Sequence, residues 1–278
     1  MKLKEKLAHL SRHGGALLAA NFYNFETLSG ILAAAAKKQS PIILQLSEGS
    51  IDYMGLKAAV SMARSALDQY GVEGWLHLDH GGSIEIVRRC LDAGFDSVMI
   101  DASERPFHEN VEITSAVVRL ASAYDANVEA ELGFVAKLGQ AQVNQSFTQP
   151  DEAAQFVEET GVNALAIAIG SAHGFYKEPP RLQLNLLSRI HAATPAALVL
   201  HGSSGIPADQ LHQAICLGIS KVNLATETKN IFMSTLRDIL AQSDEIDLRK
   251  VFPRAIQSVV HLIEEKIDLV SKTRQRSQ

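Results

Sequence analysis

The feature that most constrains this chain is a regular alternation of short apolar runs with helix-length amphipathic stretches. Most of the runs are nearly continuous rather than apolar–polar alternations, as parallel strands buried on both faces require. The pattern therefore predicts an α/β protein with a parallel sheet. The eight expected strands are Leu17–Phe22, Pro41–Leu46, Trp75–His80, Asp96–Asp101, Asn127–Leu132, Ala164–Gly170, Ala197–His201 and Lys221–Leu224.

The stretches between these runs carry apolar residues three and four positions apart, which is the spacing of an amphipathic helix. Several of them end on glycine, as at Gly71 and Gly161, a common helix C-cap. We expect residues from about Glu227 to Ser271 to be helical throughout. The other predicted helices are Glu26–Lys37, Leu56–Tyr70, Ser83–Ala93, Asn110–Tyr124, Asp151–Thr160 and Pro207–Leu217.

Eight strands alternating with helices fit either a closed (β/α)8 TIM barrel or a doubly wound open sheet. No Gly-x-Gly-x-x-Gly motif follows the first strand, which disfavours the dinucleotide-binding form of the open sheet. No linker-like segment or abrupt change of composition divides the chain. We therefore expect residues 1–278 to form a single (β/α)8 barrel domain with extra C-terminal helices.

Composition narrows the classes of function. The formal net charge is −5, which gives no reason to expect a nucleic-acid or anionic-membrane partner. The longest apolar runs are too short to span a bilayer, and the N-terminus lacks the apolar stretch of a signal peptide. Cys90 and Cys216 lie in apolar helical segments and indicate core thiols of a reducing compartment. We expect a cytoplasmic globular protein.

A polar or ionisable residue stands at or just after the end of every predicted strand. Active sites of (β/α)8 barrels lie at this end of the strands, and a buried charge is costly unless it is paired or bound to a metal. Any one of these residues could be a cap or a turn residue, but the full set favours an active site. In chain order they are Asn21, Ser47, Asp79 with His80, Asp101, Glu131, His173, His201, and Asn223 with Thr226.

Three of these strand ends carry a histidine: His80, His173 and His201. Three protein ligands and an open coordination position describe a catalytic zinc site. The alternative, that these side chains only pack or cap, stays open at this point because the chain has 10 histidines. We expect His77 to be a satisfied core residue. Five further histidines in helical or terminal regions are expected to be surface or packing residues: His9, His13, His191, His212 and His261.

Asp79 and His80 are neighbours, so a regular strand would point their side chains to opposite faces. Both can serve one site only where the strand ends and its pleat relaxes, which the following Gly81-Gly82 permits. A carboxylate near a metal ion can then move a proton to or from a substrate hydroxyl.

Two loops have the position of a phosphate site. Gly202–Gly205 follows the seventh predicted strand, and Asn223–Thr226 follows the eighth. In barrels, the loops after strands seven and eight commonly bind phosphate through backbone N–H groups at helix N-termini. A Gly-Ser-Ser-Gly loop alone is more often a flexible turn, so its position carries the argument.

These segments together make the chain resemble the class II (zinc-dependent) ketose-bisphosphate aldolases, the fructose-/tagatose-bisphosphate aldolase family, over nearly its whole length. The resemblance rests on several motifs in the right order. They are Leu76–Gly81, Ser97–Asp101, Val128–Gly133, Ala166–Gly174, Leu200–Pro207 and Lys221–Glu227.

The resemblance implies roles for individual residues. His80, His173 and His201 match the zinc ligands, and Asp79 matches the catalytic proton donor. Asp101 and Glu131 match an alternative or second site for a divalent or monovalent cation. Asn21 and Ser47 match positions near the other half of the substrate. The dihydroxyacetone-phosphate pocket is matched by Gly174, Gly202, Ser203, Ser204, Asn223, Leu224, Ala225 and Thr226.

The implied activity is reversible aldol cleavage of a ketose 1,6-bisphosphate, tagatose or fructose, to dihydroxyacetone phosphate and glyceraldehyde 3-phosphate. Zn²⁺ would act as the Lewis acid, and no lysine Schiff base is required. The resemblance also implies a place in carbohydrate metabolism, such as glycolysis. It further implies a homodimer or homotetramer, with the C-terminal helices as the expected contacts.

Two departures from the family pattern stand out. Ser203 replaces a usual glycine, but its backbone N–H can still donate. Relatives also carry an acidic mobile loop after Glu131-Leu132-Gly133, whose acid handles the C3 proton of the triose phosphate. Here no Asp or Glu lies between Glu131 and Asp151, although Lys137 could contact an anionic substrate.

The missing loop acid leaves alternatives to bisphosphate cleavage. One is an aldolase for another phosphorylated ketose that releases a different aldehyde, with a water or another carboxylate as the base. Another is a non-catalytic phosphosugar-binding protein. A metal-dependent hydrolase is disfavoured because the Asp-His pair and the phosphate loops occur together.

Overall fold

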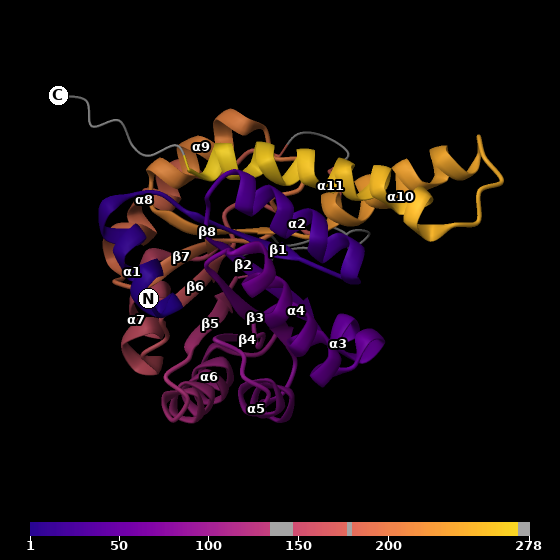
Figure 1. Cartoon of the computed structure of the whole chain (residues 1–278). Coiled ribbons are helices and arrows are strands. Elements are labelled where there is room, and N and C mark those ends of the chain that lie inside the picture. The colour runs from indigo at the N-terminus through magenta and orange to yellow at the C-terminus, as the bar shows by residue number, and fades with distance from the viewer. Residues whose placement is uncertain (134–146, 177–179, 272–278) are drawn as a thin grey trace.

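The protein is a closed barrel of parallel strands surrounded by helices. The computed structural model describes residues 1–133, 147–176 and 180–271. The strands pair in chain order around the barrel, and the last strand returns to the first (Figure 1). The predicted barrel and its eight strands are therefore confirmed. They are β1 (Leu17–Asn21), β2 (Ile42–Ser47), β3 (Gly74–Gly81), β4 (Ser97–Ile100), β5 (Asn127–Leu132), β6 (Ala164–Ile167), β7 (Ala197–Leu200) and β8 (Ile219–Leu224).

Helices form the outer layer of the barrel (Figure 1). Those predicted between strands are confirmed with ends that differ by no more than three residues. The helices are α1 (Leu3–His13), α2 (Phe25–Lys37), α3 (Glu48–Met54), α4 (Leu56–Tyr70), α5 (Ile84–Asp92), α6 (Phe107–Ser122), α7 (Pro150–Thr160), α8 (Leu184–Ala193), α9 (Ala208–Cys216), α10 (Thr226–Leu240) and α11 (Leu248–Val270).

The prediction of one continuous helix from Glu227 to Ser271 is wrong. The chain leaves helical structure after Leu240 and re-enters it at Leu248. The intervening segment, residues 241–247, is rich in polar residues that favour turns and caps. Asp247 caps α11, since its Oδ1 accepts a hydrogen bond from the backbone N–H of Arg249 at 3.0 Å. The two helices pack side by side as a hairpin that extends from the barrel (Figure 1).

The interior of the barrel changes character along its axis. At the amino ends of the strands, Leu3 and Leu7 of α1 pack against apolar strand residues such as Leu17 and Trp75 and close the barrel. Nearer the carboxyl ends the fully buried side chains are polar or charged. They include Gln45, His77, Glu129 and Lys221. The amino end of the barrel is thus closed by apolar side chains, and the polar side chains lie toward the carboxyl end, where a functional site is expected.

None of the helices within the described ranges is both long and apolar enough to cross a membrane.

Candidate active site

Four side chains meet at the carboxyl end of the barrel: His80 and Glu131 lie on β3 and β5, and His173 and His201 follow β6 and β7. One potential ligand atom from each of His80, Glu131, His173 and His201 lies within 4.8 Å of the others. The imidazole centroids of His80 and His201 are 4.8 Å apart, and those of His80 and His173 are 5.0 Å apart. The structure thus brings the three predicted histidines together and adds Glu131 to them.

The donor atoms of this cluster suit a zinc ion. His201 Nδ1 and Glu131 Oε2 are 2.8 Å apart and fully buried, yet neither makes a well-aligned hydrogen bond with any described residue. Imidazole nitrogen and carboxylate oxygen are ordinary zinc ligands. Two buried polar atoms that face one another without a hydrogen bond are expected where an ion binds.

Carboxylates outside the cluster fix the orientation of two of the imidazoles. His80 Nδ1 lies 2.7 Å from Asp101 Oδ2, which leaves Nε2 for the cluster. His201 Nε2 lies 2.9 Å from Glu129 Oε1, which leaves Nδ1. Metal-binding histidines characteristically hold their second nitrogen in this way. Asp101, predicted as part of an alternative or second cation site, lies against His80 and accepts a hydrogen bond from the Ser103 hydroxyl at 2.7 Å.

The cluster contains both neutral and charged imidazoles. Burial, together with His201 and His80, lowers the pKa of His173 to about 3. Burial also acts to lower the pKa of His201, but Glu129 and Glu131 outweigh it and raise that pKa to about 10. A bound cation would replace the proton on His201, since both compete for the same nitrogen and the same carboxylates.

Asp79 is held beside the cluster by amide side chains. Its Oδ2 accepts a hydrogen bond from Asn21 Nδ2 at 2.8 Å, and Asn21 Oδ1 accepts one from Gln45 Nε2 at 2.9 Å. Burial raises the pKa of Asp79, but the positive charge of His80, His201 and Lys221 outweighs it, and the net pKa lies below the ordinary value. Asp79 is therefore an oriented carboxylate, suited to accept a proton from a substrate.

Asp79 and His80 line the same pocket although they are neighbours in sequence, and β3 is distorted at His80. This residue has φ 52°, in the left-handed region that non-glycine residues rarely adopt. The pairing of β3 with β4 also shifts register between Leu78 and Gly81. The distortion was expected on the Gly81-Gly82 pair and instead falls on the candidate ligand itself. Such strain concentrates at functional sites.

A buried ionic layer lies beneath the cluster, and most of its residues were not predicted from the sequence. Lys221 Nζ is 2.8 Å from Glu129 Oε2, and both side chains are fully buried. Lys221 also donates to Asn223 Oδ1 at 2.8 Å. His77 is buried here as predicted, with Nδ1 2.7 Å from Ser97 Oγ. The available signal was a charged residue in the middle of an apolar strand, as at Glu129 and Lys221.

The two predicted phosphate loops lie next to each other. Ser203 Oγ donates to the backbone oxygen of Asn223 at 2.5 Å, and the backbone N–H of Glu227 donates to Ser204 Oγ at 3.3 Å. The small pocket between the loops and the cluster is lined by Asn21, Asp79, His80, His173, Gly174, Gly202, Ser203, Ser204, Asn223, Ala225 and Thr226.

Two of the residues that the family resemblance matches to the substrate, Ser47 and Leu224, do not line the small pocket. Leu224 is fully buried and packs in the apolar core, so only its backbone can face a ligand. Ser47 lies beside Asp79 in the strand register, and its Oγ accepts a hydrogen bond from the backbone N–H of Ser50 as the cap of α3. Residues 134–146, which include Lys137 and contain no Asp or Glu, lie outside the described residues.

We predict that Gly202→Ala destabilises the protein. Gly202 has φ 67°, and a Cβ there would lie 2.2 Å from the backbone oxygen of Ala172. The strained backbone alone should lower the free energy of unfolding by about 1–3 kcal/mol. Urea unfolding measures the change. Gly49→Ala is the control, because a Cβ at Gly49 meets nothing within 4 Å; equal stability of the two variants would contradict the prediction.

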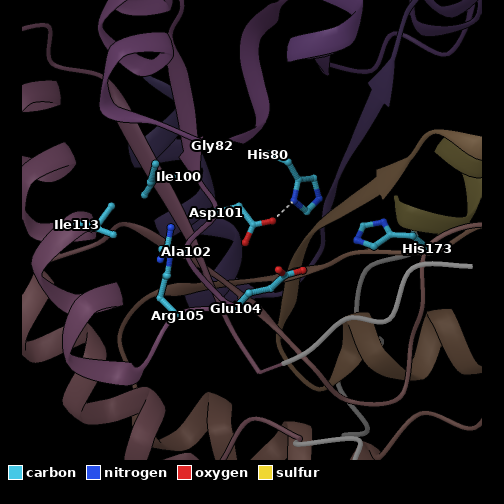
Figure 2. Close-up of a pocket in the computed structure, with 9 residues that line it drawn as sticks. All are labelled: His80, Gly82, Ile100, Asp101, Ala102, Glu104, Arg105, Ile113 and His173. Carbon is cyan, nitrogen blue, oxygen red and sulfur yellow. Dashed lines mark hydrogen bonds and ion pairs between the residues drawn. The ribbon is translucent and has the colours of Figure 1, made fainter. Parts of the chain in front are cut away.

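A larger cavity of about 540 Å³ opens beside this pocket and shares His80 and His173 with it (Figure 2). Its remaining walls combine charged and apolar side chains. They come from Gly82, from Ile113 of α6, and from Ile100, Asp101, Ala102, Glu104 and Arg105 at and after the end of β4. The site therefore has room for a substrate that extends beyond the histidine cluster.

A closed (β/α)8 barrel with clustered histidines and carboxylates at the carboxyl ends of its strands defines a barrel enzyme. The family model for class-II fructose-bisphosphate aldolase matches residues 1–275. The chain belongs to that family, and it is a class II aldolase, an enzyme of aldol cleavage.

Individual proteins that are similar to this chain are also named as aldolases. The chain is 42% identical over 257 residues to a fructose-bisphosphate aldolase from Geobacillus stearothermophilus, with 90% of each chain covered. It is 38% identical over 273 residues to a fructose-bisphosphate aldolase from Staphylococcus epidermidis strain RP62A, with 96% of each covered. Among solved structures it resembles the YdjI aldolase from Escherichia coli K12, with a TM-score of 0.85, 31% identity, and coverage of 98% of this chain and 96% of that one.

Proposed function

We propose that this enzyme, a single barrel domain, catalyses zinc-dependent, reversible cleavage of a ketose 1,6-bisphosphate to dihydroxyacetone phosphate and glyceraldehyde 3-phosphate. The observation that carries the proposal is the convergence of His80, His173, His201 and Glu131 beside the pocket formed by the two phosphate loops. Fructose or tagatose 1,6-bisphosphate is the proposed substrate. The names of the relatives from G. stearothermophilus and S. epidermidis support fructose.

The cluster residues would hold the zinc ion, and Asp101 and Glu129 would hold His80 and His201 in orientation. When bound, zinc supplies Lewis-acid stabilisation of the negative charge that develops on the ketose oxygens. Asp79 accepts the proton of the C4 hydroxyl as the C3–C4 bond breaks, and Asn21 keeps its carboxylate in place.

The substrate phosphate would occupy the pocket between the two loops. Its small size and its lining by Gly174, Ser203, Ser204 and Thr226 suit a compact anion bound by backbone N–H and hydroxyl groups. In this proposal the dihydroxyacetone-phosphate half of the ketose would lie next to the histidines. The aldehyde half then extends into the cavity of about 540 Å³ (Figure 2).

A coupled assay for dihydroxyacetone phosphate tests the proposal. We expect cleavage of fructose or tagatose 1,6-bisphosphate, loss of activity with a chelator, and recovery with added Zn²⁺. Cleavage that survives complete removal of metal would contradict the zinc dependence. Stoichiometric zinc without cleavage of either sugar would contradict the bisphosphate assignment and favour the second candidate, another phosphorylated ketose. The absence of any Asp or Glu between Glu131 and Asp151 favours that candidate.

We also propose that the enzyme works in the cytoplasm as a homodimer or homotetramer. Cys90 and Cys216 are free thiols. The hairpin of α10 and α11 exposes large apolar side chains at Leu240, Ile246 and Leu248, with 90% of Ile246 accessible. Exposed apolar patches mark interaction surfaces.

The hairpin surface yields a testable prediction about assembly. Ile246→Glu combined with Leu248→Glu should shift the enzyme to a smaller species, because two charges cannot be buried at an apolar contact. Light scattering after size-exclusion chromatography measures the mass. Lys57→Glu, exposed on α4, is the control. An unchanged mass for the double variant would remove the hairpin from the interface.

A further inference from the structure

Two of the three clustered histidines lie on the connections that follow β6 and β7, and these connections also supply part of the phosphate pocket. His173 and Gly174 follow β6, whereas His201 and Ser203 follow β7. Binding of zinc by the histidines and of phosphate by the pocket therefore requires a fixed spacing between the two connections.

The sheet does not supply this spacing. The last paired residues of β6 and β7 are Ala166 and Val199, which lie before either connection begins. In the part of the chain that the structure describes, one hydrogen bond joins residues 170–176 to residues 201–206, and its donor is the hydroxyl of Tyr176. This side chain is therefore the candidate for holding the two connections together.

The hydroxyl of Tyr176 bonds to both connections at once. It accepts a hydrogen bond from the backbone N–H of Ala172 at 2.7 Å and donates one to the backbone oxygen of Gly202 at 2.7 Å. Burial raises the pKa of Tyr176 to about 12, so the phenol keeps the proton that it donates. Ala172 directly precedes His173, and Gly202 directly follows His201. One hydroxyl thus holds the backbone beside two of the clustered histidines.

The packing around Tyr176 keeps this hydroxyl in place. Its ring is half-buried and packs against the apolar core. The two connections also approach each other closely, because a Cβ at Gly202 would lie 2.2 Å from the backbone oxygen of Ala172. The contact between them is therefore tight, and the Tyr176 hydroxyl supplies its hydrogen bonds.

Building on the function proposed above, we propose that Tyr176 is a positioning residue. Its hydroxyl holds the connections after β6 and β7 at the spacing that zinc and the substrate phosphate both require. Tyr176 does not line the pocket between the phosphate loops, so it acts through the backbone of its neighbours. Loss of this one hydroxyl should therefore weaken the binding of two different ligands.

Tyr176→Phe tests the first ligand, zinc. The variant keeps the ring and its packing and removes only the hydroxyl. We expect zinc affinity to fall by about 10–100-fold, as it does when an outer partner that orients metal ligands is lost. Competition with a chromogenic chelator measures this affinity. The visible absorption spectrum of the Co²⁺-loaded variant should also differ from that of the wild type, because it reports the geometry of the ligands.

Ethyl phosphate tests the second ligand, because it has a phosphate group but no carbonyl or hydroxyl oxygen with which to chelate the metal. Its affinity at saturating zinc, measured by calorimetry, should fall by about 2–10-fold in Tyr176→Phe, the loss expected for one hydrogen bond. Tyr124→Phe is the matched control. It also removes a phenol that donates a hydrogen bond, to Asp92 Oδ1 at 2.5 Å, and Tyr124 lines a different cavity. This control should bind zinc and ethyl phosphate as the wild type does.

The outcomes separate positioning from simple stabilisation. A loss confined to one of the two ligands would overturn the proposal, because the hydroxyl holds both connections. Unchanged affinities with a lower thermal midpoint would also overturn it, and so would a variant with no cooperative thermal transition, since the hydroxyl would then serve folding. If the wild type binds neither zinc nor ethyl phosphate, the proposed function fails first, and that result is distinguishable from failure of Tyr176 alone.

Discussion

Replacing Asp79 by asparagine is expected to abolish aldol cleavage while leaving C3 proton exchange of dihydroxyacetone phosphate in place. The amide has the size of the carboxylate but cannot accept the C4 hydroxyl proton. General-base catalysis of this kind contributes about 10²–10⁴-fold, so cleavage should fall by a similar factor. The coupled assay measures cleavage, and NMR in D₂O measures exchange.

The geometry explains why the two activities should separate. Asp79 lies in the pocket lined by the phosphate loops. Its Oδ2 accepts a hydrogen bond from Asn21 Nδ2 at 2.8 Å, and its Oδ1 accepts one from Asn223 Nδ2 at 3.4 Å. The proton at C3 is a different proton from that of the C4 hydroxyl, so its exchange does not require the carboxylate of Asp79. Asn21→Ala should show a smaller version of the same effect, because it loosens Asp79 without removing it. Equal loss of exchange and cleavage in Asp79→Asn would show that one group serves both protons.

The barrel could be predicted from the sequence because parallel strands buried on both faces are nearly continuous apolar runs. Each such run was assigned correctly, and the residue that follows it was expected at the carboxyl end. This single rule of topology was enough to bring His80, His173 and His201 into one cluster. Chain order alone would not do so, since these residues are far apart in sequence.

The local details that failed depend on tertiary contacts. α1 was not predicted, and it is held by Leu3 and Leu7, which pack against apolar strand residues at the amino end of the barrel. The break between α10 and α11 was not predicted, although residues 242–245 are all polar, and the Asp247 cap starts a new helix there. The left-handed φ of His80 could not be predicted either, because it coincides with a register shift in the pairing of β3 with β4, which local sequence does not specify.

The ionic layer was missed for a different reason. The prediction used only the residues at strand ends, and the charged residues of this layer lie within strands. Glu129 lies two residues before the strand-end Glu131, on the same face of β5. Lys221 lies on β8, across the barrel interior. Burial raises the pKa of Glu129, but Lys221 and His201 outweigh it and hold that pKa well below its usual range. Glu129 therefore stays charged and depends on its lysine partner.

That dependence gives the second large prediction. Lys221→Met should lower the free energy of unfolding by about 3–5 kcal/mol, because it leaves the carboxylate of Glu129 buried without its cation. The methionine side chain fills a similar volume, so a cavity adds little. Zinc affinity should fall as well, since Glu129 orients His201 through a 2.9 Å hydrogen bond. Urea unfolding and zinc titration with a chromogenic chelator give the two quantities.

A double variant separates the charge from the packing. Glu129→Gln combined with Lys221→Met keeps an acceptor for His201 and removes both charges of the pair, which are 2.8 Å apart. It should therefore be more stable than Lys221→Met alone, because replacing both members of a buried ion pair costs less than removing one. If the double variant were as unstable as the single one, the loss would come from lysine packing. If it regained stability but not zinc affinity, the carboxylate itself would be what positions His201.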